Sequence, residues 1–82
     1  MTSEQHRKAF CSNVARILSV RRIELELSMT QIAERSGLSQ QMVSYVEREI
    51  RIPGIDTLLR IAEALELDIV EIVREADRRS KE

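Results

Sequence analysis

The most constraining feature of the chain is the stretch from Leu27 to Glu47, which carries the signals of two short helices joined by one tight turn. Ser28 is followed three residues later by Gln31, the spacing of a reciprocal capping pair at a helix start. Gly37 lies where a sharp turn after the first helix needs a positive φ angle. Ser39 then provides the cap of a second helix.

The second of these helices is predicted to run from about Gln40 to Arg48 and to have two different faces. Val43 and Val46 lie one turn apart and face inward, as Ile32 and Ala33 do on the first helix. The outer face keeps side chains that donate, accept and pack without carrying a charge: Gln40, Gln41, Ser44 and Tyr45.

The pattern continues beyond this stretch. Glu47, Arg51 and Pro53 form an E-x-x-x-[KR]-x-P run, and residues 53–73 read PGIDTLLRIAEALELDIVEIV. Together these segments resemble the Cro/repressor (Xre) family of bacterial DNA-binding domains, and are similar to restriction–modification controller proteins and small phage repressors. The resemblance implies an all-α, five-helix phage-repressor-like domain with a central helix-turn-helix. It also implies a sequence-specific transcriptional regulator, not an enzyme, that binds double-stranded DNA as a homodimer on near-palindromic operators through a major-groove recognition helix.

The remaining helices are predicted from apolar periodicity and capping signals. Residues 7–22 carry one apolar stripe, and Arg21 in its middle indicates either a helix end or an arginine drawn inward by a carboxylate. We expect a flexible N-terminus over 1–6, the helix-turn-helix domain over 7–76 and a charged tail over 77–82. The stripe consists of Phe10, Val14, Ile17 and Leu18.

The last two helices follow Pro53 and Gly54, and a D-x-x-E cap formed by Asp68 and Glu71. The fourth helix is predicted to bury one face made of Ile55, Leu58, Leu59, Ile61, Ala62 and Leu65. The fifth is predicted to add Leu67, Ile69, Ile72 and Val73 to the core.

The resemblance implies which residues meet DNA. A glutamine amide donates to adenine N7 and accepts from adenine N6, so Gln40 and Gln41 are expected to read bases together with Ser44. Tyr45 is expected to pack on a thymine methyl or to bond a phosphate. The alternative is that these four side chains are ordinary solvated residues of a surface helix. The phosphate contacts are expected from Arg22, Thr30, Gln31, Ser39, Arg48 and Arg51.

Family members pair an arginine late in the first helix with the glutamate that ends the recognition helix. Here the pair is expected between Arg21 or Arg22 and Glu47, where it fixes the angle between helices. The chain departs from the family pattern at three positions. Glu26 and Glu49 stand where glycine is common, and a glutamine that bonds phosphate is replaced by Met29.

The expected dimer interface consists of Ile52, Val70 and Val73, although Val70 is equally compatible with a lone surface valine. An alternative function is an antitoxin-type protein that binds a toxin partner and its own promoter. Under that alternative, Glu26, Met29 and Glu49 mark a surface partly released from binding DNA.

Charge and reactive residues limit the remaining classes. The chain has 13 basic and 14 acidic residues, but residues 1–22 are predominantly basic and residues 49–73 predominantly acidic. A basic end beside the recognition helix is one interpretation, and an ordinary mixed-charge surface is the other. His6 and Cys11 are single residues of their kind, so we expect no metal site, no catalytic residues and no cofactor. The absence of a long apolar run and of a secretory signal predicts no membrane partner and a cytoplasmic, bacterial or phage-encoded protein.

Overall fold

The computed structural model describes residues 2–82, and these residues form five helices and no strand. This confirms the predicted all-α fold. The helices are α1 (Ser3–Glu24), α2 (Met29–Ser36), α3 (Gln40–Glu47), α4 (Ile55–Ala64) and α5 (Ile69–Ser80).

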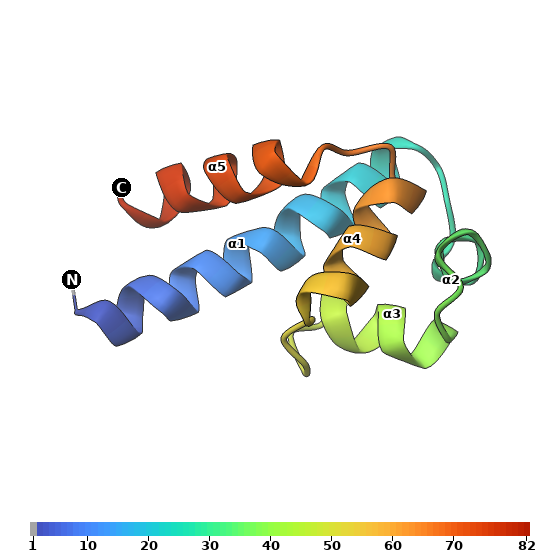
Figure 1. The fold of residues 1–82 in the computed structure, drawn as a ribbon, viewed down its shortest axis with the longest axis horizontal. Helices are drawn as coiled ribbons and strands as arrows, with labels where there is room; N and C mark the ends of the chain where they lie inside the picture. Colours follow the sequence, from blue (N-terminus) through green and yellow to red (C-terminus); the bar gives the residue numbers. More distant parts are fainter. Residues whose placement is uncertain (1) are drawn as a thin grey trace.

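The long helix α1 forms the spine of the molecule, which measures 38 × 21 × 20 Å along its principal axes. Helix α5 runs back along α1 in the antiparallel direction, so that both ends of the chain lie at one end of the long axis (Figure 1). The shorter helices α2, α3 and α4 lie towards the opposite end (Figure 1). Helix α3 contacts α1 directly, and α4 contacts α2 and α5.

Helix α1 begins four residues before the predicted start at Arg7. Thr2 accepts a hydrogen bond from the main-chain N–H of Gln5, and the Gln5 side chain accepts one from the N–H of Thr2. This capping box satisfies two donors that a helix start leaves unpaired. Residues 3–6 of the segment predicted to be flexible thus form the first turn of α1, and Met1 lies outside the described residues.

The core receives at least one fully buried side chain from every helix or its terminal cap. Leu18 of α1, Ile32 of α2 and Ile72 of α5 are at most 2% exposed. Arg21 lies within α1, which continues past it to Glu24. The Arg21 Nε donates to the main-chain carbonyl of Leu65 at 3.1 Å, so the side chain has a hydrogen-bond acceptor although it points inward. The inward arginine thus caps the end of α4 rather than meeting a carboxylate. The largest fully buried side chains are Leu18, Ile32, Leu65, Ile72, Val43 and Val46.

Three residues that periodicity placed in the core are exposed instead. Ile55 is 78% exposed and Leu59 is 36% exposed, because the buried face of α4 is narrower than its apolar stripe. Val73 is 41% exposed on α5, where Ile72 and Ala76 occupy the inner face. The surface therefore carries more apolar area than the sequence predicts.

Four successive helices end in the same way, with a residue in the left-handed conformation. Only Gly37, with φ 73°, suits that conformation without strain. After α1, the N–H of Glu26 bonds the carbonyl of Ile23 and the N–H of Leu27 bonds that of Arg22, which is the Schellman pattern. The left-handed positions held by non-glycine residues in the described part of the chain are Glu26, Glu49 and Glu66.

Candidate nucleic-acid interface

The turn between α2 and α3 is built by the residues that the sequence singled out. The Ser28 hydroxyl accepts from the N–H of Gln31, whose side chain accepts from the N–H of Ser28, so the predicted capping pair is confirmed. At the other end of α2, the N–H groups of Gly37 and Leu38 both bond the carbonyl of Ala33. A Cβ atom at Gly37 would lie 3.3 Å from the Arg60 guanidinium, so the turn is also crowded.

Helix α3 is anchored by its inner face and presents its outer face to solvent. Val43 is 0% exposed and Val46 is 1% exposed, and the Ser39 hydroxyl caps the helix by accepting from the N–H of Met42. Gln40 and Gln41 are exposed, whereas Ser44 and Tyr45 are half-buried. The four predicted reading residues therefore share one helix, with the two glutamines outermost.

The predicted pair between α1 and α3 is formed by Arg22 and Glu47. The Arg22 Nε and Nη2 atoms donate to the two Glu47 carboxylate oxygens at 2.8 and 3.1 Å, and Nη1 donates to the carbonyl of Leu27 at 2.9 Å. The side chains are only 16% and 6% exposed. Because all three guanidinium nitrogens donate to groups within the protein, Arg22 holds α3 against α1, which differs from the phosphate contact expected of it.

The other residues expected to contact phosphate differ in exposure and in the hydrogen-bond donors that remain available to a phosphate. Thr30, Arg48 and Arg51 are exposed. Gln31 uses its side-chain carbonyl in the capping pair, which leaves its amide N–H groups for another acceptor. The Ser39 oxygen already accepts from the α3 backbone, so its hydroxyl proton is its remaining donor.

Three side chains on this face interact with one another, which the sequence did not predict. The Gln41 Nε2 donates to the Tyr45 hydroxyl at 2.7 Å. The Arg51 guanidinium carbon lies 5.6 Å from the centre of the Tyr45 ring, within the range of a cation–π contact. The i, i+4 spacing of Gln41 and Tyr45 was the available signal, because residues at that spacing are neighbours on a helix.

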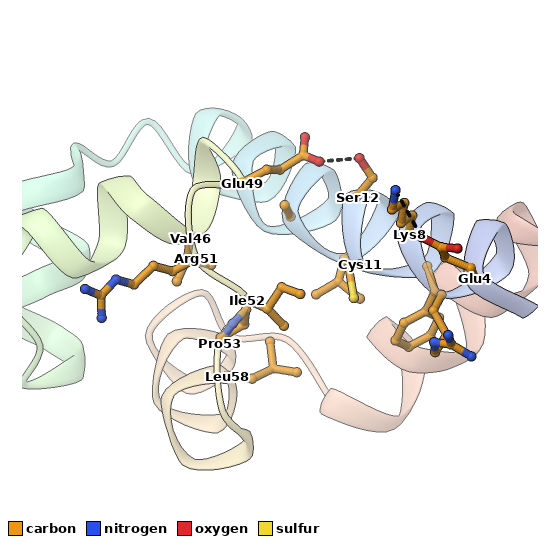
Figure 2. A pocket seen from close by; sticks show the side chains of 14 residues that line it. Glu4, Lys8, Cys11, Ser12, Val46, Glu49, Arg51, Ile52, Pro53 and Leu58 are labelled. Carbon is orange, nitrogen blue, oxygen red and sulfur yellow. Dashed lines mark hydrogen bonds and ion pairs between the residues drawn. The ribbon is translucent and has the colours of Figure 1, made fainter.

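Glu49 does not place its charge beside the outer face of α3. The side chain accepts a hydrogen bond from the Ser12 hydroxyl of α1, while Arg51 extends in the opposite direction (Figure 2). An apolar groove of about 640 Å³ lies between α1 and the segment that follows α3, and its lining includes Cys11, Ile52 and Leu58 (Figure 2). The acidic residue that departs from the family pattern thus ties the loop after α3 to α1.

Among the basic residues of positions 1–22, Arg22 meets α3 through its bond to Glu47, and Arg7 and Lys8 line a groove that Val46 of α3 also lines. Arg21 and Arg22 bond groups inside the protein, and Lys8 lies 3.5 Å from Glu4. The first turns of α1 also lie at the opposite end of the long axis from α2 and α3 (Figure 1). A basic end flanking the recognition helix stays a prediction, and the exposed arginines that directly follow α3 are Arg48 and Arg51.

Within residues 2–82, no three histidine, cysteine or acidic side chains gather as a metal site would require. None of the helices described here combines the length and the apolar character needed to cross a bilayer. His6 lies on α1 and its Nε2 meets the Asp77 carboxylate at 3.2 Å, which links the first turns of α1 to α5.

Comparisons with known proteins identify this arrangement of helices. A helix-turn-helix family model (HTH_3) matches residues 18–72. The chain belongs to this Xre-type helix-turn-helix family. Its relatives include an uncharacterized HTH-type transcriptional regulator, y4dJ, of Sinorhizobium fredii (strain NBRC 101917 / NGR234), which is 41% identical over 71 residues that make up 87% of each chain.

A second family member is an uncharacterized HTH-type transcriptional regulator, MT0491, of Mycobacterium tuberculosis (strain CDC 1551 / Oshkosh). It is 54% identical over 39 residues, or 48% of this chain, and the match spans 28% of that longer protein. Among solved structures, a point mutant of the restriction–modification controller protein C.Esp1396I matches with a TM-score of 0.75 and 25% identity over 82% of this chain and 87% of that one. A second mutant of the same protein, bound to its highest affinity operator site, matches with a TM-score of 0.79 and 23% identity, over 90% and 97%. These likenesses confirm the predicted family and five-helix fold.

Proposed function

We propose that the chain is a sequence-specific transcriptional regulator that binds double-stranded DNA and inserts α3 into the major groove. The supporting observation is that α3 buries one face and exposes the other. Val43 and Val46 are buried in the core, while Gln40 and Gln41 are exposed to solvent. An amide that projects from a fixed helix can pair with the edge of an adenine. A controller protein with the same fold has been solved bound to its operator site, which supports DNA binding by this arrangement of helices.

The phosphate contacts in this proposal come from both ends of the helix-turn-helix. Arg48 and Arg51 are exposed beyond the end of α3, and Thr30, Gln31 and Ser39 lie at the starts of α2 and α3, where main-chain N–H groups face outward. With only two arginines here, the affinity should depend on salt concentration less steeply than that of strongly basic DNA-binding proteins.

We further propose that the regulator acts as a homodimer on near-palindromic operators with half-sites about one helical turn, roughly 34 Å, apart. Ile52 is 76% exposed beside the apolar groove, and Val70 and Val73 are 56% and 41% exposed on α5. Ile55 and Leu59, which the sequence placed in the core, add a second exposed apolar row on α4. A small domain gains stability when such surface is covered by a second copy.

The antitoxin alternative gains less support from the structure than the regulator does. Of the three residues that motivated it, Glu26 and Glu49 occupy left-handed helix-ending positions, and Glu49 bonds Ser12, whereas Met29 is half-buried at the start of α2. Both of these departures therefore have local backbone consequences. A toxin partner stays a prediction from the family resemblance.

The proposal is tested by selecting bound duplexes from a random pool and measuring the mass of the complex. We expect a two-fold symmetric consensus and a complex that contains two protein chains. Replacing Gln41 with Ala should relax the base preference at one position of each half-site and weaken binding there by about 1–3 kcal/mol. As the matched control, Arg48→Gln should weaken binding to all sequences alike and reduce the salt dependence by about one phosphate contact. A pool that yields no consensus contradicts the proposal.

A further inference from the structure

The Gln41–Tyr45 contact determines which hydrogen-bonding groups Gln41 has left for a base. A glutamine amide has two N–H donors and one carbonyl acceptor. One N–H of Gln41 is used by the Tyr45 hydroxyl at 2.7 Å. One N–H and the carbonyl oxygen remain, which is the donor–acceptor combination that adenine N7 and N6 require. Guanine presents two acceptors, N7 and O6, and paired recognition of guanine requires two donors.

Tyr45 is held in place more firmly than the glutamine it contacts. Its ring is half-buried, and the Arg51 guanidinium covers the ring with a separation of 5.6 Å. The N–H groups of Ile50 and Arg51 both bond the Tyr45 carbonyl, at 2.9 and 3.2 Å, so the main chain itself brings Arg51 over the ring. Gln41 is exposed, and its amide would otherwise rotate freely.

We propose that Tyr45 is a positioning residue that holds the Gln41 amide with one donor occupied, so that Gln41 discriminates adenine from guanine. Tyr45 thereby acts on specificity without itself touching a base. This inference rests on the proposed major-groove function of α3 and specifies which base that helix prefers at the Gln41 position. This role differs from the two that the sequence predicts for Tyr45, which are packing on a thymine methyl and bonding a phosphate.

The test is the Tyr45→Phe variant, which keeps the ring and its contact with Arg51 and removes only the hydroxyl. The position read by Gln41 is first identified in the selected duplex as the one where Gln41→Ala levels the base preference. Binding is then measured for four duplexes that differ only at that position. We expect the wild type to prefer adenine to guanine roughly tenfold or more. In Tyr45→Phe the ratio should fall to roughly two- to threefold, chiefly because the guanine duplex binds better once both N–H groups are free.

The matched control is Ser3→Ala, which removes a hydroxyl from the exposed first turn of α1, far from α3, and should leave the adenine-to-guanine ratio unchanged. Denaturant unfolding of each variant confirms that it is folded. An unchanged ratio in Tyr45→Phe overturns the inference, as does an equal loss of affinity for all four duplexes, which would make Tyr45 a phosphate contact. If the wild type is sequence-selective but Gln41→Ala removes the base preference at no position of the duplex, the inference also fails while the proposed function stands. A wild type without any sequence preference contradicts the proposed function itself.

Discussion

Removing the Glu47 carboxylate should be the most destabilising single change at the α1–α3 contact. In the native protein this carboxylate receives two charge-assisted hydrogen bonds from Arg22, at 2.8 and 3.1 Å, and the two side chains are 6% and 16% exposed. The Glu47→Ala variant leaves the guanidinium in the same enclosed site with only the Leu27 carbonyl as acceptor. Breaking a buried pair in this way costs about 3–5 kcal/mol.

The lower part of that range, about 3 kcal/mol, fits this site because part of Arg22 still reaches solvent. A domain of this size has a total unfolding free energy of roughly 4–12 kcal/mol, so the loss removes a large fraction of it. The assay is urea unfolding followed by circular dichroism, with the denaturant slope compared between variants to verify that the same transition is observed. As the control, the exposed Glu34→Ala on α2 should change the stability by at most about 0.5 kcal/mol.

A double variant distinguishes an unpaired buried charge from simple loss of packing. Replacing both Arg22 and Glu47 with Met removes both charges and keeps apolar volume at the site. We expect it to recover most of the stability lost in Glu47→Ala, because the penalty arises from the orphaned guanidinium. The reasoning is refuted if Glu47→Ala costs less than about 1 kcal/mol, or if the double variant is as unstable as the single one.

Two further perturbations test the helix ends and the α5 surface. Glu26→Gly and Glu66→Gly should each stabilise the protein by about 0.5–1 kcal/mol in urea unfolding, because glycine relieves left-handed strain, whereas Gly37→Ala should destabilise it at the crowded turn. Destabilisation by both glycine variants would contradict the strain account. The hydrogen bonds from Arg78 and Arg79 lower the pKa of Glu75 from 4.5 to about 2, so its contribution to stability is complete above about pH 4.5 and is lost as the pH falls towards 2. The melting temperature should therefore fall less between pH 5 and pH 2 in Glu75→Gln than in the wild type. Equal falls in the two proteins would refute this. High salt should reduce the difference because the ion pair is exposed.

The sequence predicted those parts of the fold that depend on local signals. The capping pair of Ser28 and Gln31 and the turn at Gly37 were identified because their chemistry acts within one helical turn. The pair of Thr2 and Gln5 has the same S/T-x-x-Q spacing, but the polar composition of the first residues favours a flexible terminus and conceals this signal. A local rule applied to the first residues would have placed the start of α1 correctly.

Burial and partner choice were less predictable because they depend on how helices meet. Ile55 and Leu59 fit the apolar period of α4, but periodicity gives the direction of a face and not the width that neighbours cover. The same limit applied to the choice between Arg21 and Arg22, which lie next to each other and point about 100° apart on a helix. One side chain caps the end of α4 and the other reaches Glu47, a distinction that only the packing of α1 against two other helices determines.

The outer face of α3 depends on residues that have no part in reading DNA. An isolated helix of eight residues is not stable in water, so α3 exists because its ends and inner face are held by the rest of the domain. Ser39 fixes its start, Val43 and Val46 fix its rotation, and the bond from Arg22 to Glu47 fixes its end. A change at any of these anchors alters the direction of every outer side chain together, whereas a change at Tyr45 alters the direction of one. Loss of affinity for all sequences and loss of preference at a single base therefore have separate physical origins in this domain.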